Sequence, residues 1–121
     1  MPTTHGVQCR WARRRLGVQP RRPPAGPHIA TLDALELVAS RLDGATELYL
    51  DGGVRSGLDV LTSVAIGATA VFIGRPAAYG LAIAGSEGVQ AVLTQLRRQL
   101  KGPMALSGCP TLADVDRRLV R

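Results

Sequence analysis

From Thr31 onward, apolar residues recur at the spacing of helices and short strands. The first pattern predicts a helix that Thr31 caps and that ends at Asp43–Gly44. The short stretch that follows, 47–50, ends in three apolar residues and predicts a buried strand. The apolar side of the helix is formed by Leu32, Leu35, Val38 and Leu42.

The same alternation continues toward the C-terminus. A second helix is expected over 56–66, with Leu58, Leu61 and Val64 or their neighbours buried and with Gly67 ending it. A second strand is expected over 68–74, a loop rich in Gly and Ala over 77–85, and a longer helix from Ser86 to Lys101–Gly102. A last helix is expected from Thr111, with Asp114 completing a capping box. This alternation of helices and strands predicts an α/β fold with a parallel sheet.

The first 30 residues differ from the rest in composition. Residues 1–32 hold six arginines and no acidic residue, whereas the remaining chain holds nine basic and nine acidic residues, so the net charge of +6 comes from this segment. It also contains five prolines. We therefore expect two regions: a basic, disordered Pro/Arg-rich segment over 1–30, and a folded α/β region over 31–121.

Each predicted strand is followed by glycine and arginine. The stretch DGGVR, residues 51–55, follows the first strand, and Gly74–Arg75 follows the second. Because parallel strands end at the same edge of a sheet, Arg55 and Arg75 are expected to lie close together there. Guanidinium groups bind phosphate well, and glycines let backbone N–H groups approach a ligand closely. The unpaired N–H groups at the start of the helix after DGGVR are expected to attract an anion as well. The pattern thus favours a phosphate site over two separate arginines that pair with nearby acids.

Residues 31–118 resemble the FMN-dependent 2-hydroxy-acid oxidases and dehydrogenases, the family of glycolate oxidase, lactate oxidase and mandelate dehydrogenase. The stretches that carry the resemblance are DGGVR, FIGRP, YGLA and MALSGC, in this order and at the family's spacing. The resemblance implies the C-terminal portion of a TIM (β/α)8 barrel, with strands 7 and 8 and their helices. It also implies an FMN site formed by Asp51, Gly52, Gly53, Val54, Arg55, Gly74 and Arg75.

The catalytic histidine of this family lies in an SNHGGRQLD motif that the chain lacks. His5 lies too far upstream of Asp33, and His28 falls where the family has a connecting loop. We therefore expect no catalytic residue in this chain, no metal ligand, and no activity of the chain by itself.

The genetic code offers a reason for the missing motif. Residues 18–26, VQPRRPPAG, can be encoded by bases that, read with a shift of one base, spell Ser-Asn-His-Gly-Gly-Arg-Gln-Leu. The hypothesis is a one-base frame change between about Gly26 and Thr31, with residues 1–26 translated out of frame.

Two functions remain open. The first is a fragment of an FMN-dependent enzyme that oxidises 2-hydroxy acids, with an N-terminal half or a second copy as partner. The alternative is a non-catalytic flavin- or phosphate-binding module with a basic arm for nucleic acid, which the scarcity of aromatic residues in the arm disfavours. No apolar run reaches the roughly 20 residues of a membrane span. The two cysteines form no disulfide framework, which suits the cytoplasm.

Overall fold

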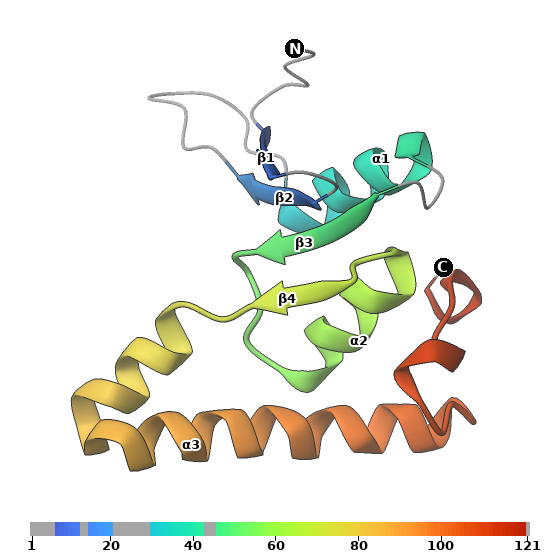
Figure 1. Ribbon diagram of the computed structural model, residues 1–121. Helices are drawn as coiled ribbons and strands as arrows, with labels where there is room; N and C mark the ends of the chain where they lie inside the picture. Colours follow the sequence, from blue (N-terminus) through green and yellow to red (C-terminus); the bar gives the residue numbers. More distant parts are fainter. Residues whose placement is uncertain (1–6, 13–14, 21–29, 43–45, 121) are drawn as a thin grey trace.

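The computed structural model describes residues 7–12, 15–20, 30–42 and 46–120 (Figure 1). Its sheet has the strand order β1-β2-β3-β4. β1 (Val7–Ala12) and β2 (Arg15–Pro20) are antiparallel, and β2 is parallel to β3 (Glu47–Asp51). β3 is parallel to β4 (Ala70–Phe72), so the predicted parallel arrangement of these two strands is confirmed.

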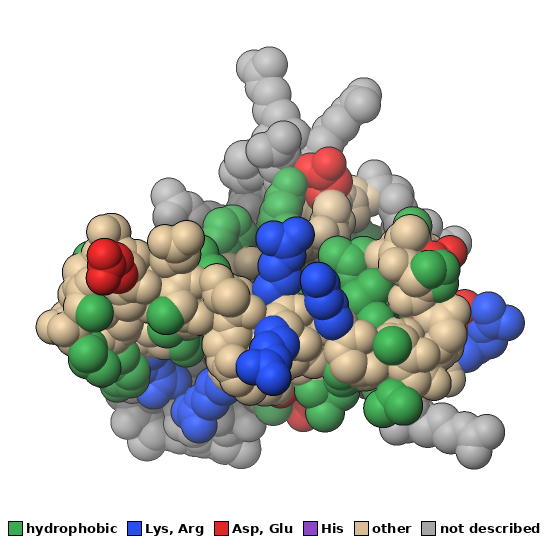
Figure 2. Space-filling view, turned by 90° about the horizontal axis from the view of Figure 1, so that it is seen from below, with side chains coloured by type: hydrophobic (Ala, Val, Ile, Leu, Met, Phe, Trp, Pro, Cys, Tyr) green, Lys and Arg blue, Asp and Glu red, His purple; other side chains and the backbone are tan. Residues whose placement is uncertain are grey.

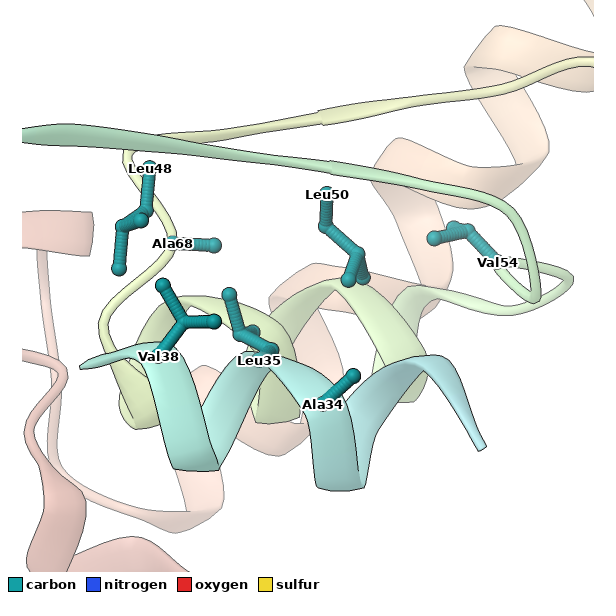
Figure 3. Packing of buried hydrophobic residues seen from close by; sticks show 7 residues of the cluster. All are labelled: Ala34, Leu35, Val38, Leu48, Leu50, Val54 and Ala68. Carbon is teal, nitrogen blue, oxygen red and sulfur yellow. The ribbon is translucent and has the colours of Figure 1, made fainter. Parts of the chain in front are cut away.

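The main core lies between one face of the sheet and the helices α1 (Thr31–Leu42) and α2 (Gly57–Ile66). Alternate residues of β3, Leu48 and Leu50, point at α1, as Figure 3 shows. Period-two alternation in a strand brings one set of side chains to one face, and the apolar set of β3 is the buried one. The buried members of this core are Ala34, Leu35, Val38, Leu48, Leu50, Val54 and Ala68.

The opposite face of β3 and β4 is not covered by a helix of the described chain. The rings of Tyr49 and Phe72 meet there with centroids 6.0 Å apart, and Phe72 is 54% exposed. Among the described residues, α1 and α2 therefore cover one face of the sheet, and no helix covers the other face of β3 and β4.

Helix α3 (Arg75–Leu106) follows β4 and bends sharply at Ala84 and Gly85, where the backbone leaves the helical conformation. In Figure 1 its first part runs away from β4 and its second, longer part runs below α2. A second core joins α2, this longer part and the C-terminal turns η1 (Leu112–Asp114) and η2 (Arg117–Leu119). Its buried residues are Leu61, Ala65, Cys109 and Val115.

The longer part of α3 also carries basic side chains on its outer surface. Arg97, Arg98 and Lys101 are exposed, and Glu87 is the last acidic residue of the helix. Figure 2 shows a group of Lys and Arg side chains near the middle of the face seen from below.

Three expectations from the sequence need correction. The loop predicted over 77–85 is helical up to Ile83, and the helix predicted from Ser86 continues to Leu106. The predicted last helix is the 3-10 turn η1, although its capping box between Thr111 and Asp114 is present. Thr31 is the first residue of α1 instead of its cap, because the N–H of Ala34 donates to the carbonyl of Ala30.

The segment over 1–30 was expected to be disordered, and the structure instead has β1 and β2 within it. The physical reason is that β3 would otherwise have an unpaired edge, and β2 supplies its hydrogen-bonding partner. Residues 1–6, 13–14 and 21–29 lie outside the described residues, and with them His5 and His28.

Within the described parts of the chain, no helix combines the length and apolarity that a bilayer crossing requires.

Candidate functional site

The turn after β3 depends on two consecutive glycines. Gly52 has a φ of 98° and Gly53 a φ of 85°, a region that side chains with a Cβ rarely adopt. Val54, which follows, is buried in the core, and Arg55 is exposed. The turn therefore consists of two glycines without side chains, then Val54, whose side chain is buried in the core, and then Arg55, whose side chain is exposed.

The turn after β4 is shorter. Gly74 precedes the first residue of α3, Arg75, and no side chain caps this helix end. A Cβ atom on Gly74 would have no atom within 4 Å, so the backbone here is open to a ligand. Pro76, in the first helical turn, lacks the N–H that would be unpaired there.

Both turns line one pocket of about 500 Å³. All the residues named from the sequence as the cofactor site lie along it: Asp51, Gly52, Gly53, Val54, Arg55, Gly74 and Arg75. The structure thus brings Arg55 and Arg75 to a shared pocket, because β3 and β4 are adjacent, parallel and end at the same edge.

Sequence reasoning missed three residues of the pocket wall, Phe72, Pro76 and Tyr79. Tyr79 lies four residues after Arg75 on α3, a spacing that puts both on one helix face. This spacing could have predicted Tyr79 as a pocket residue, but a loop and not a helix was expected over 77–85.

The N-terminus of α2 is closed by side chains of the protein itself. The Asp59 Oδ2 atom accepts hydrogen bonds from the Arg55 N–H (2.9 Å), the Ser56 N–H (2.8 Å) and the Ser56 hydroxyl (2.9 Å). The Gly57 N–H donates to the Gln99 Oε1 atom of α3 at 3.1 Å. The expectation that unpaired N–H groups of this helix start receive an anion is therefore wrong for these residues.

The charges at the pocket favour an anion at its arginines. Among the described residues, the ion pairs are Arg117–Glu36 and Arg118–Asp116, so neither Arg55 nor Arg75 is held by a carboxylate in this way. Both guanidinium groups keep donors for a ligand.

Asp59 is ionised next to this pocket. Burial raises the pKa of the Asp59 carboxyl, but the hydrogen bonds from the Arg55 N–H, the Ser56 hydroxyl and the Ser56 N–H outweigh it, and the Arg55 charge adds to them. The net result is a pKa below the usual value for aspartate.

The described residues contain no group of three His, Cys, Asp or Glu side chains that could hold a metal ion. Fold and pocket together define an α/β protein with a binding site at the carboxyl ends of adjacent parallel strands.

Comparison with known proteins makes this class specific. A family model described as FMN-dependent dehydrogenase matches residues 26–121. The chain therefore belongs to the FMN-dependent dehydrogenase family, and the resemblance seen in the sequence is confirmed.

Individual relatives agree. Human 2-hydroxyacid oxidase 1 is 49% identical over 92 residues, which are 76% of this chain and 25% of that protein. An L-lactate oxidase of a Nostoc species is 48% identical over 88 residues, 73% of this chain and 24% of the relative. The chain thus spans about a quarter of the length of the relatives it matches.

Solved structures show the same relationship. A lactate oxidase structure from Pediococcus acidilactici matches with a TM-score of 0.78 and 37% identity. The match covers 86% of this chain and 29% of the lactate oxidase chain. A structure of (S)-mandelate dehydrogenase matches with a TM-score of 0.70 and 32% identity. The match covers 75% of this chain and 25% of the dehydrogenase chain.

Proposed function

We propose that this chain is part of an FMN-dependent oxidoreductase that oxidises 2-hydroxy acids to 2-keto acids, and that its pocket holds the phosphate end of FMN. The observation that carries the proposal is the shared pocket of Arg55 and Arg75 at the ends of two parallel strands. β3 and β4 would then be strands 7 and 8 of a (β/α)8 barrel, in which the loops after these strands often bind phosphate.

The residues of the pocket fit the cofactor. Two guanidinium groups offer several donors to a phosphate dianion, and charge-assisted hydrogen bonds of this kind are strong. The open backbone at Gly74 admits the phosphate without a steric conflict. The backbone of Gly52, Gly53 and Val54, with the Asp51 carboxylate beside it, would contact the remainder of the cofactor.

The chemistry of the reaction comes from the flavin, which accepts the hydride equivalent of the 2-hydroxy acid when it is bound. This chain would contribute binding and orientation. The described residues include no histidine. That the chain alone turns over no substrate stays a prediction.

Flavin binding tests the proposal directly. The Kd of the full 121-residue chain is measured for FMN and for riboflavin, which lacks the phosphate. FMN should bind more tightly, and Arg55→Ala or Arg75→Ala should each weaken FMN by about tenfold or more while riboflavin is unaffected. Arg98→Ala, which removes an exposed arginine outside the pocket, is the control and should change neither Kd. Equal affinities for FMN and riboflavin would overturn the proposal.

The boundary near residue 26 is a second part of the proposal. A frame change between about Gly26 and Thr31 would leave residues 1–26 out of frame, and the family match, which begins at residue 26, supports this position. The DNA sequence decides it: codons that do not spell the SNHGGRQL motif in the shifted frame would remove the idea.

The remaining expectations concern partners and place. The chain spans about a quarter of its relatives' length. A separately encoded N-terminal half, or a second copy, stays our prediction for the partner of this chain. The nucleic-acid alternative rests on the basic composition of residues 1–32 and is not favoured by the family match. Location in the cytoplasm also stays a prediction, since one relative, from Arabidopsis thaliana, is named as peroxisomal.

A further inference from the structure

We propose that Asp59 is a positioning residue for the anion site: its carboxylate fixes the turn that aims Arg55 into the pocket. The proposal rests on the function proposed above and assigns a role to a side chain that does not line the pocket itself.

The hydrogen bonds of Asp59 are concentrated on this turn. A single carboxylate oxygen, Oδ2, accepts from the N–H groups of Arg55 and Ser56 and from the Ser56 hydroxyl, all within 2.8–2.9 Å. Asp59 belongs to the first turn of α2, and α2 is packed in the core through Leu61 and Ala65. The carboxylate therefore ties the backbone of Arg55 to a helix that is itself held in place.

The preceding residues make such a tie necessary. Gly52 and Gly53 have no side chains that could restrict the turn, and the next contact with the core is Val54, which is 4% exposed. Arg55 is exposed and lies between this anchor and Ser56. Without the Asp59 carboxylate, the Arg55 N–H would lose its hydrogen bond to α2, and Arg55 would be held only through its neighbours, Val54 in the core and Ser56, whose carbonyl accepts from the Val60 N–H.

A second capping box in the chain separates positioning from ordinary helix capping. Asp114 Oδ2 accepts from the N–H of Thr111 at 2.9 Å and from its hydroxyl at 2.5 Å, as Asp59 does from Ser56. Asp114 does not line the pocket, and the additional bond that Asp59 accepts comes from the N–H of Arg55. Asp114 is therefore a matched control for the loss of a capping carboxylate.

Electrostatics alone predicts the opposite effect on binding. Removing a negative charge next to an anion site should tighten the anion. If Asp59 positions Arg55, its removal should weaken the anion instead, because the guanidinium group is no longer held toward it. The sign of the change therefore distinguishes the two roles.

The test measures Kd for FMN and riboflavin with the full chain and the variants Asp59→Ala, Asp59→Asn and Asp114→Ala. Asp59→Ala should weaken FMN by about tenfold. Asp59→Asn, whose neutral oxygen accepts weaker hydrogen bonds, should weaken it by about threefold and also serves if the alanine variant does not fold. Riboflavin affinity should stay constant, and Asp114→Ala should change neither Kd.

A double-mutant cycle completes the test. In the Arg55→Ala background, Asp59→Ala should have no further effect on the Kd for FMN, because Asp59 acts through Arg55. Unchanged or tighter FMN binding in both Asp59 variants would overturn the inference, and so would an equal loss for FMN and riboflavin. An absence of preference for FMN over riboflavin in the unmutated chain would instead overturn the proposed function, which keeps the two failures distinct.

Discussion

The backbones of Gly80 and Gly88 lie against each other across the bend of α3. A Cβ atom on Gly88 would lie 1.9 Å from the carbonyl oxygen of Gly80, and one on Gly80 would lie 2.6 Å from the carbonyl oxygen of Gly88. The first part of α3 carries Arg75 to the pocket, while the second part packs on α2. This contact between two glycines therefore helps to set where Arg75 lies relative to Arg55.

Gly88→Ala should destabilise the chain by about 2 kcal/mol or more, because the new methyl group has to displace backbone and not a flexible side chain. Urea unfolding followed by circular dichroism measures the change. Gln90→Ala, an exposed position on the same helix, is the control and should stay within about 0.5 kcal/mol of the unmutated chain. Equal stability of Gly88→Ala and the unmutated chain would show that the two parts of α3 do not meet as described.

Gln99 connects α3 to the start of α2 through its hydrogen bond from the Gly57 N–H. Gln99→Ala should cost about 1 kcal/mol of unfolding free energy, since it leaves a buried N–H donor without its acceptor. The matched variant is Gln95→Ala, an exposed glutamine one turn earlier, which should be nearly neutral. The same urea titration decides, and a Gln99 variant as stable as the Gln95 variant contradicts the prediction.

Leu50 of β3 and Leu58 of α2 are the same residue type, yet their burial differs: Leu50 is 1% exposed and Leu58 is 56% exposed. Leu50→Ala should cost about 2–5 kcal/mol because it opens a cavity between β3 and α1. Leu58→Ala should change stability by less than about 0.5 kcal/mol. If the two substitutions cost the same in thermal or urea unfolding, the sheet face that packs on α1 has been assigned wrongly.

Acid should destabilise the fold. Hydrogen bonds lower the pKa of Asp59, despite its burial, and hydrogen bonds also lower the pKa values of Asp114 and Asp116. A carboxyl group whose pKa is lower in the folded chain stabilises the fold fully above its unfolded value, about 3.9 for aspartate. That stability is lost as the pH falls through the folded values.

Unfolding midpoints in urea should therefore be constant between neutral pH and about pH 5 and should fall below about pH 4. The Asp59→Asn variant should lose less stability than the unmutated chain over the same drop in pH, because its side chain does not titrate. A midpoint that rises on acidification would contradict the prediction.

The sequence predicted the parts of the fold that depend on local signals. The strand over 47–50 follows from the apolar residues 48–50, and the end of α2 follows from Gly67, whose φ is 127°. Gly52, Gly53, Arg55, Gly74 and Arg75 were predicted because glycine and arginine follow two successive strands, whereas Asp51 and Val54 were implied by the family resemblance.

The parts that were missed depend on contacts distant in the chain. The helix over 77–83 contains Gly80, which reads as a loop signal until Gly88 is known to pack on it. β1 and β2 lie in a segment of basic and proline-rich composition. β2 pairs with β3 across 32 positions of the chain, as Arg15 does with Glu47. The closure of the α2 N-terminus by Gln99, from another helix, has no local signal either.

The free side of β4 has a consequence for handling the protein. Within the described chain β4 pairs with β3 alone, and its residues, Ala70–Phe72, carry no charge and no proline that would discourage a further strand from adding. In concentrated solution, copies of the isolated chain should thus associate by pairing of strands at the free edge of β4. The chain should stay monomeric in dilute, freshly prepared samples.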